Sequence, residues 1–165
     1  MTITQENRPT PPLILASSSR YRAELLRRLG LTFSQISPNI DESPRTGETP
    51  QELARRLACE KACAVAREHP GSLVIGSDQV ASLDGVALGK PGTLEKAKQQ
   101  LTLCSGKSVC FYTGLCLAGP DAGAVLARVD LDHPLDAGPA QQPAPVRGRV
   151  HRVHADGHPR LLGEV

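Results

Sequence analysis

Aromatic side chains are scarce in this sequence: they make up 2% of its 165 residues, and tryptophan is absent. Proteins that bind single-stranded nucleic acid commonly stack bases on several aromatic rings, so no such platform is expected. An excess of one charge is also missing, since 19 Lys and Arg stand against 17 Asp and Glu, a net charge of +2. This near balance argues against a nucleic-acid-binding protein that works through bulk positive charge.

Long apolar runs are missing too. No segment approaches the roughly 20 apolar residues that a membrane-spanning helix needs, and the N-terminal MTITQENRPTPP lacks the apolar region of a secretory signal. The five cysteines are odd in number and show no C-x-x-C spacing, so neither a zinc site nor a disulfide framework is expected. We therefore expect a cytoplasmic protein in a reducing compartment, with Cys59 and Cys63 as small packing residues on a helix.

Two common catalytic patterns do not occur. Without a G-x-x-x-x-G-K-[ST] loop the chain is not a P-loop NTPase. His69 is the only histidine before residue 133, so no Ser/His/Asp arrangement is expected. His151, His154 and His158 lie in a segment with no supporting carboxylate or structural frame, and we do not expect them to form a metal site.

Alternating strand and helix patterns predict an α/β protein with a mixed sheet. The expected strands cover 12–17, 32–38, 72–83, 86–91, 108–119 and 124–132, and the expected helices cover 19–30, 49–71 and 93–103. A T-x-x-E capping box at Thr49 begins the long helix, and Asp84-Gly85 is typical of a hairpin turn. We expect a flexible N-terminus over 1–11, one domain over 12–132, and a low-order Pro/Arg/His-rich tail over 133–165.

A cluster of hydroxyl and cationic groups opens the first helix. Three serines at 17–19 precede it, and Arg22 falls in its first turn, where the helix dipole already favours negative charge. Arg22 lies on the apolar stripe predicted to face the core, which continues through three leucines: Leu25, Leu26 and Leu29. One interpretation is a phosphate cradle. The other is a serine cap beside a partly exposed arginine.

A second cation lies on the apolar stripe of the long helix, and an acid lies within the strand that follows. Lys61 either extends its ammonium to solvent or aims it into a cleft. Asp78, flanked by valines and with open space expected beside it at Gly76, is a candidate general base or metal ligand. The alternative is a structural Asp paired with a buried cation. Lys90, in GKPG, either presents its charge to the same cleft or is an ordinary surface lysine.

Asp41 and Glu42 form an acidic pair on a polar loop. Such oxygen ligands suit Mg²⁺ or Mn²⁺, which bridge phosphates, although alone they would be solvated charges. Hydroxyls, three cations, a buried acid and this pair together suit metal-assisted hydrolysis of a polyphosphate.

The segments LASSSRYRAELL, IDESPR, EKA, GSDQV, GKP and FYTG occur in this order between Leu13 and Gly114. In this ordered set the chain resembles the Maf-like nucleotide pyrophosphatases. GSDQV together with Tyr21 is similar to the 7-methyl-GTP subfamily. The resemblance implies an elongated Maf/ITPase-like α/β fold with a curved mixed sheet flanked by helices, cytoplasmic and often homodimeric.

The resemblance also implies metal-dependent hydrolysis of 7-methyl-GTP to 7-methyl-GMP and pyrophosphate. The expected partners are the nucleoside triphosphate substrate and a second copy of the chain in a homodimer, and no nucleic acid or membrane is expected. The resemblance implies Asp78 as the proton acceptor, Glu42 near the metal, and Tyr21 and Gln79 at positions tied to base preference. Five further residues match the triphosphate contacts of the family: Ser17, Ser19, Arg22, Lys61 and Lys90.

The later part of the family pattern, with its S-F-K-S-E-G segment, has no match here, so the C-terminal part of the fold is expected to be incomplete. The change of composition near residue 120 looks like a shifted reading frame. We therefore expect exposed apolar surface and reduced or absent activity. Two alternatives to the 7-methyl-GTP enzyme stay open: a pyrophosphatase for other modified nucleotides, and a nucleotide-binding remnant without turnover.

Overall fold

The fold is known from a computed structural model, which describes residues 10–119, 125–132, 149–153 and 159–164. The strands are β1 (Leu13–Ala16), β2 (Ser34–Ile36), β3 (Leu73–Leu83), β4 (Val86–Leu88), β5 (Val109–Ala118), β6 (Val125–Asp132), β7 (Arg149–Val153) and β8 (Pro159–Glu164). The helices are α1 (Arg20–Arg28), α2 (Pro50–Glu68) and α3 (Leu94–Cys104). The predicted helices and strands up to residue 132 are thus confirmed.

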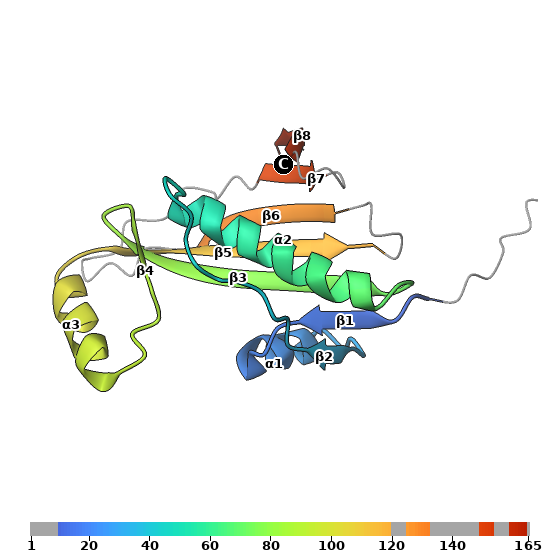
Figure 1. The fold of residues 1–165 in the computed structure, drawn as a ribbon, viewed down its shortest axis with the longest axis horizontal. Helices are drawn as coiled ribbons and strands as arrows, with labels where there is room; N and C mark the ends of the chain where they lie inside the picture. Colours follow the sequence, from blue (N-terminus) through green and yellow to red (C-terminus); the bar gives the residue numbers. More distant parts are fainter. Residues whose placement is uncertain (1–9, 120–124, 133–148, 154–158, 165) are drawn as a thin grey trace, which may run out of the picture.

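One sheet contains all of these strands, in the order β2-β1-β3-β5-β6-β7-β8, with β4 paired to the far end of β3. β1 is parallel to both of its neighbours, and the remaining pairs are antiparallel. The predicted α/β class with a mixed sheet is therefore confirmed. Figure 1 shows an elongated arrangement, with α1 at the β1–β2 edge and α3 beyond the β4 end of the sheet.

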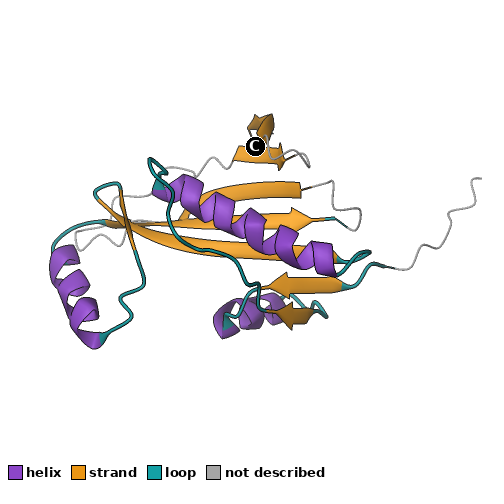
Figure 2. Ribbon diagram, viewed as in Figure 1, coloured by secondary structure: helices purple, strands orange, loops and turns teal. Residues whose placement is uncertain are grey.

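The long helix α2 runs across one face of the sheet, over β3 and β5 (Figure 2). Its start follows the predicted signals, because the Thr49 hydroxyl accepts from the Glu52 amide while the Glu52 carboxylate accepts from the Thr49 amide. The hairpin between β3 and β4 turns through Asp84 and Gly85, both with positive φ, as the Asp-Gly pair predicts. Local capping and turn chemistry therefore set the bounds of these elements.

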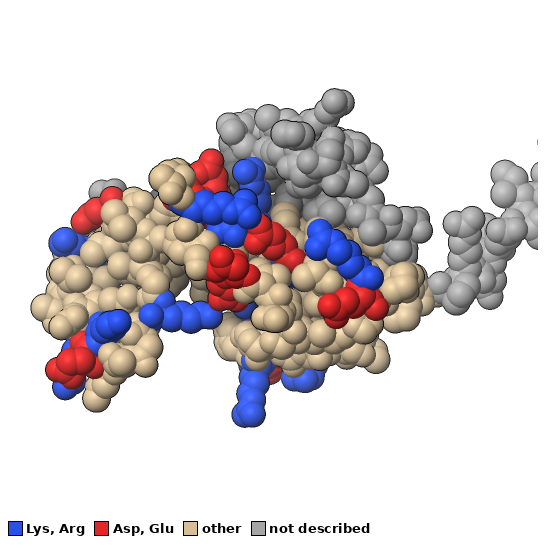
Figure 3. Space-filling model, in the orientation of Figure 1, with Lys and Arg blue, Asp and Glu red and all other residues tan. Residues whose placement is uncertain are grey.

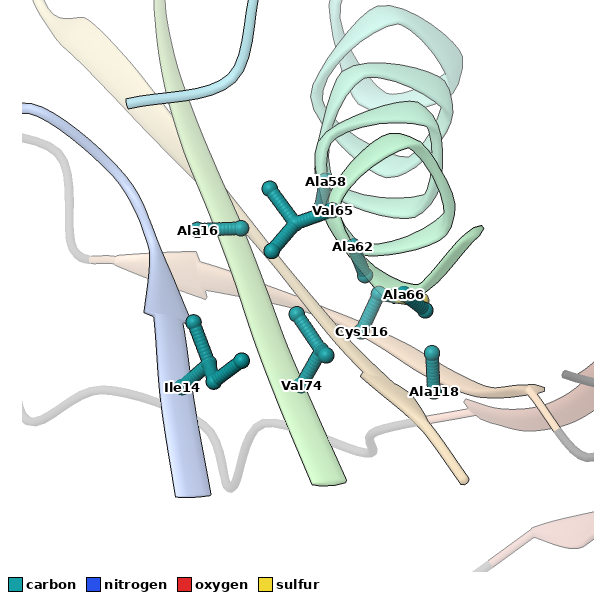
Figure 4. Close-up of a cluster of buried hydrophobic side chains, with 9 residues drawn as sticks. All are labelled: Ile14, Ala16, Ala58, Ala62, Val65, Ala66, Val74, Cys116 and Ala118. Carbon is teal, nitrogen blue, oxygen red and sulfur yellow. The ribbon is translucent and has the colours of Figure 1, made fainter. Parts of the chain in front are cut away.

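Small side chains form the core between α2 and the sheet. Ala58, Ala62 and Val65 of α2 pack against residues of β1, β3 and β5, among them Val74 and Cys116 (Figure 4). Cys59 and Cys63 pack against the same cluster, in agreement with the packing role predicted for them. Alanines on the helix keep the two layers close together, and this close approach positions the candidate site.

The apolar stripe predicted for α1 is wrong in part. Ala23 is the buried residue of this helix, whereas Leu25 is 41% exposed and Leu29 is 72% exposed. Arg22 is half-buried. The physical reason is that α1 lies at the edge of the sheet (Figure 1), so only part of its apolar face is covered: Ala23 is buried and Leu26 is half-buried.

Two strands of the tail were not anticipated by the sequence. Residues 133–165 show no clear period of two, yet β7 and β8 continue the sheet beyond β6. His151 lies in β7, whereas His154 and His158 fall outside the described residues, as do residues 1–9 of the expected flexible N-terminus.

Apolar side chains remain exposed on several described elements, as expected. Helix α3 has no buried residue, and its Leu94 and Leu101 are 72% and 73% exposed. On the sheet, Leu115 of β5 is 47% exposed. Among the described helices, none has the length and apolar character needed to cross a membrane.

Candidate functional site: a lysine–carboxylate chain beside a serine–arginine cradle

Four of the predicted site residues form one chain of charge contacts. Lys61 of α2 donates from Nζ to Oδ1 of Asp78 on β3 at 2.6 Å, and the same Nζ lies 2.8 Å from Oε1 of Glu42. The other carboxylate oxygen of Glu42 lies 3.3 Å from Nζ of Lys90, in the loop between β4 and α3. Lys61 and Asp78 are both buried, whereas Lys90 is exposed. Strand β3 and the acidic loop thus meet at one lysine of α2, and Lys90 joins them through Glu42.

This convergence depends on a close approach of α2 to the sheet. Asp78 and Gly76 lie on the face of β3 that α2 covers, and Gly114 is directly opposite Asp78 on β5. A Cβ built on Gly76 would overlap the carbonyl oxygen of Ala58, and one on Gly114 would lie 2.6 Å from the carbonyl carbon of Ala54. The two glycines therefore leave room for the helix backbone, and Lys61 comes within hydrogen-bond reach of Asp78.

The expectation of open space beside Asp78 at Gly76 is therefore wrong. Backbone atoms of α2 fill that space. The missing side chain serves the packing of helix against sheet, and not a cavity for a ligand.

Charge pairing compensates the burial of these groups. An ionised carboxylate or ammonium is costly to remove from water unless it has a partner of opposite charge. Lys61 supplies that partner for Asp78 and for Glu42, and it thereby links the β3 acid to the acidic loop. The hydrogen bond from Lys61, followed by the charges of Lys61 and Lys90, lowers the pKa of Glu42, while partial burial opposes the shift.

A second group of predicted residues, called the serine–arginine cradle below, lies where β1 leads into α1 and consists of Ser17, Ser19 and Arg22. The Ser19 hydroxyl accepts from the backbone amide of Arg22 and caps α1, and the Arg22 guanidinium donates from Nη1 to the Ser17 hydroxyl at 3.3 Å. The Ser17 hydroxyl also accepts from the Ser19 amide. The serine cap is therefore confirmed, whereas the phosphate cradle stays a prediction, with the Arg22 guanidinium turned back toward the serines.

The strand register places the two groups next to each other. β1 and β3 run parallel, and Ala16 pairs with Gly76. Ser17 follows Ala16 directly, and Asp78 lies two residues after Gly76 within β3, so Asp78 lies close to the point where β1 ends and the serines begin. Neighbouring strands are about 4.8 Å apart, so a ligand of the size of a triphosphate can reach both groups. On the face seen in Figure 3, acidic and basic side chains lie side by side over α2 and the segments that flank it.

Three predicted residues lie apart from these groups. Tyr21 is 69% exposed on α1. Gln79 follows Asp78 and therefore faces the opposite side of the sheet, where its side-chain amide donates to the Thr113 hydroxyl at 2.9 Å. Asp41 is exposed and accepts from the Ser43 amide within its own loop, and its part in a cation site stays a prediction. The contacts of this chain therefore do not assemble the residues tied to base preference around Asp78.

Sequence reasoning missed two residues that support the site. Gln35 of β2 donates from Nε2 to the backbone oxygens of Ser17 and Ser19, at 2.8 and 3.3 Å, and so fixes the serine loop. Arg56 of α2 exposes only 12% of its side chain and binds the loop that carries Glu42. The signal for Arg56 in the sequence was its spacing of four residues to Glu60 on the same helix. No sequence signal pointed to Gln35.

The carboxylates present could share a divalent cation with a substrate. Within the described residues, no group of three or more His, Cys, Asp and Glu side chains is placed to hold a metal ion. Glu42 and Asp78 nevertheless contact the same ammonium, so their oxygens lie close together. Mg²⁺ typically takes one or two carboxylates and completes its shell with phosphate oxygens and water, which fits this pair.

Comparisons with known proteins agree with the resemblance. The family described as Maf-like protein matches residues 12–133. A 7-methyl-GTP pyrophosphatase of Pseudomonas syringae pv. tomato is 60% identical over 113 residues, which cover 68% of this chain and 59% of that protein. One of Xanthomonas campestris pv. campestris is 61% identical over 117 residues, covering 71% and 61%. One of Bordetella pertussis is 58% identical over 107 residues, covering 65% and 54%. The chain thus spans between 54% and 61% of the length of these relatives.

Proposed function

The chain belongs to the Maf-like protein family, and from this premise we propose that it is a nucleoside triphosphate pyrophosphatase that hydrolyses 7-methyl-GTP to 7-methyl-GMP and pyrophosphate. The observation that carries the proposal is the buried contact between Lys61 and Asp78, joined by Glu42 and placed beside the serine–arginine cradle. Relatives of this chain that are about 60% identical bear the name 7-methyl-GTP pyrophosphatase, and this name is the reason for proposing 7-methyl-GTP as the substrate.

The cradle would hold the phosphate chain. Ser17 and Ser19 offer hydroxyls, Arg22 offers a guanidinium, and the N-terminus of α1 offers backbone N–H groups with the favourable end of the helix dipole. Lys61 and Lys90 add positive charge from α2 and from the loop after β4. Such a set stabilises the negative charge that grows on the departing pyrophosphate.

Asp78 would accept the proton of the attacking water. Its carboxylate is held at a fixed place by Lys61, and proton transfer by a positioned carboxylate typically speeds a reaction about 10²–10⁴-fold. The bond broken would be the one between the α-phosphorus and the bridging oxygen, and pyrophosphate would leave with that oxygen.

Glu42, with Asp78 near it, would hold Mg²⁺ or Mn²⁺ together with substrate oxygens. When bound, the cation supplies Lewis-acid stabilisation of the phosphoryl oxygens. The loop that carries Glu42 is therefore part of the proposed site, as are the lysines that Glu42 now contacts.

A second candidate is a nucleotide-binding chain without strong base preference, or without turnover. The observation that favours it is the position of Gln79 on the sheet face opposite Asp78, together with the exposure of Tyr21. A pyrophosphatase for other modified nucleotides would accept a broad panel, and a remnant would bind the triphosphate and release nothing.

The test is pyrophosphate release with Mg²⁺ over a panel of nucleotides: 7-methyl-GTP, GTP and other modified triphosphates. We expect 7-methyl-GTP to be turned over fastest, and Asp78→Asn to lower its turnover at least about 10²-fold. Lys61 keeps Glu42 as a partner in that variant, so it should remain folded. Asp84→Asn, in the exposed turn that follows the same strand, is the matched control and should retain full activity. Equal turnover by Asp78→Asn and the parent would exclude Asp78 as the base.

A further inference from the structure

The loop between β2 and α2 carries Glu42, and a cluster of ionic contacts joins this loop to α2. Only 12% of the Arg56 side chain is exposed. Its Nε and Nη2 donate hydrogen bonds to the two carboxylate oxygens of Glu48, at 2.6 and 2.9 Å. Nη2 also donates to the backbone oxygen of Ser43, and Nη1 donates to Glu60. Arg45 completes the cluster, with its amide on Glu48 and its guanidinium on Glu60. These five residues are called the loop clasp below.

Glu42 directly precedes Ser43, the first loop residue that the loop clasp holds. The Ser43 amide donates to the Asp41 carboxylate at 2.9 Å, which closes a local turn around Glu42. Arg56 binds the carbonyl of Ser43, the residue that ends this turn. The guanidinium thus determines where the backbone at Glu42 lies, and with it whether the Glu42 carboxylate reaches Lys61.

The number of contacts made by one side chain distinguishes Arg56 from an ordinary surface ion pair. An exposed pair is worth about 0–1 kcal/mol and often fixes nothing. Arg56 instead makes four hydrogen bonds in a bidentate and bridging pattern to both the loop and its own helix. Only a planar guanidinium has this geometry, because a lysine ammonium is a single point charge on a flexible chain.

We propose that Arg56 is a positioning residue of the site: it holds the acidic loop against α2 so that Glu42 is presented to Lys61 and Lys90. It does not touch the phosphate groups and acts through Glu42. The inference rests on the proposed function for its effect on turnover, but its effect on the loop stands apart from any activity.

The first test measures the loop itself by hydrogen exchange of backbone amides in the full chain, with Arg56→Lys as the variant. The Arg45 amide, which donates to Glu48, and the Ser43 amide should exchange at least about tenfold faster in the variant. The Thr49 amide is held by Glu52 and not by the loop clasp, so it should keep its rate. Arg67→Lys, an exposed position on the same helix, should change none of these rates. Unchanged exchange at Arg45 and Ser43 in Arg56→Lys would overturn the proposal.

The second test asks whether Arg56 acts through Glu42, by a double-mutant cycle of Arg56→Lys and Glu42→Gln. We expect Arg56→Lys to lower turnover of 7-methyl-GTP about tenfold in the parent, and less than about twofold when Glu42 is already Gln. Additive losses would show that Arg56 acts by another route. Should the parent chain show neither turnover nor nucleotide binding, the proposed function fails, and the exchange rates alone then decide the inference.

Discussion

Gly76→Ala should loosen the contact between α2 and the sheet. The added Cβ would overlap the carbonyl oxygen of Ala58, and it would lie 2.7 Å from the amide nitrogen and 2.8 Å from the Cβ of Ala62. Ordinary contact begins near 3.4 Å. Because two of these three atoms belong to the helix backbone, no side-chain rotation relieves the overlap, and the helix itself has to shift.

The magnitude follows from the site of the overlap. Overpacking a core typically costs about 1–3 kcal/mol, and we expect Gly76→Ala to lie at the upper end, near 3 kcal/mol, because the obstacle is backbone. For a chain of this length each kcal/mol lowers Tm by about 2–4 °C, so a fall of roughly 6–12 °C is expected. Turnover should fall as well, since the shift pulls Lys61 away from Asp78.

The assay is urea and thermal unfolding followed by circular dichroism. Gly89→Ala is the matched control, because no atom lies within 4 Å of its Cβ position and its φ is not in the left-handed range. Its free energy of unfolding should stay within about 0.5 kcal/mol of the parent. A Gly76→Ala chain as stable as Gly89→Ala would refute the claim that α2 lies in close contact with β3 at this point.

Two further predictions concern the segment before α2. Thr49→Ala removes the capping box with Glu52 and should cost about 1 kcal/mol in thermal unfolding, whereas Thr49→Ser should retain most of it. The hydrogen bond from Arg56 lowers the pKa of Glu48 below its ordinary value of 4.5. The ionised Glu48 carboxylate therefore contributes fully to stability above pH 4.5, and this contribution is lost as the pH falls through the folded-state pKa. Glu48→Gln should therefore weaken the chain at pH 7 and flatten its acid unfolding below pH 4.5; an unchanged acid slope would contradict this.

Local signals in the sequence predicted the elements well because the groups involved are neighbours along the chain. Thr49 and Glu52 cap α2, and Asp84-Gly85 closes the hairpin, through contacts that span three residues or fewer. The same holds for the cap of α1 at Ser19. Such contacts depend on spacing alone, and a single sequence contains the spacing.

Local signals could not predict which face of a helix becomes covered by another element. The stripe of α1 has the right period, but period does not tell whether another element packs on it, and Leu29 remains exposed. Likewise, Lys61 and Asp78 were identified one at a time, as a cation on an apolar stripe and an acid within a strand. That they bind each other is decided by the depth at which α2 packs, which no local pattern contains.

Gly76 and Gly114 show why stability and site chemistry cannot be separated here. They lie around Asp78 on the face toward α2, one two residues earlier on β3 and the other directly opposite on β5. A side chain at either place would hold the helix away, and a lysine at position 61 would then have to bridge a wider gap to reach the acid. The absent side chains therefore determine the 2.6 Å contact as directly as the two charged groups do. It follows that Gly114→Ala, which removes no proposed ligand group, should lower both the free energy of unfolding and turnover. A variant that lowered only one of them would show that the Lys61–Asp78 contact does not depend on the packing depth of α2.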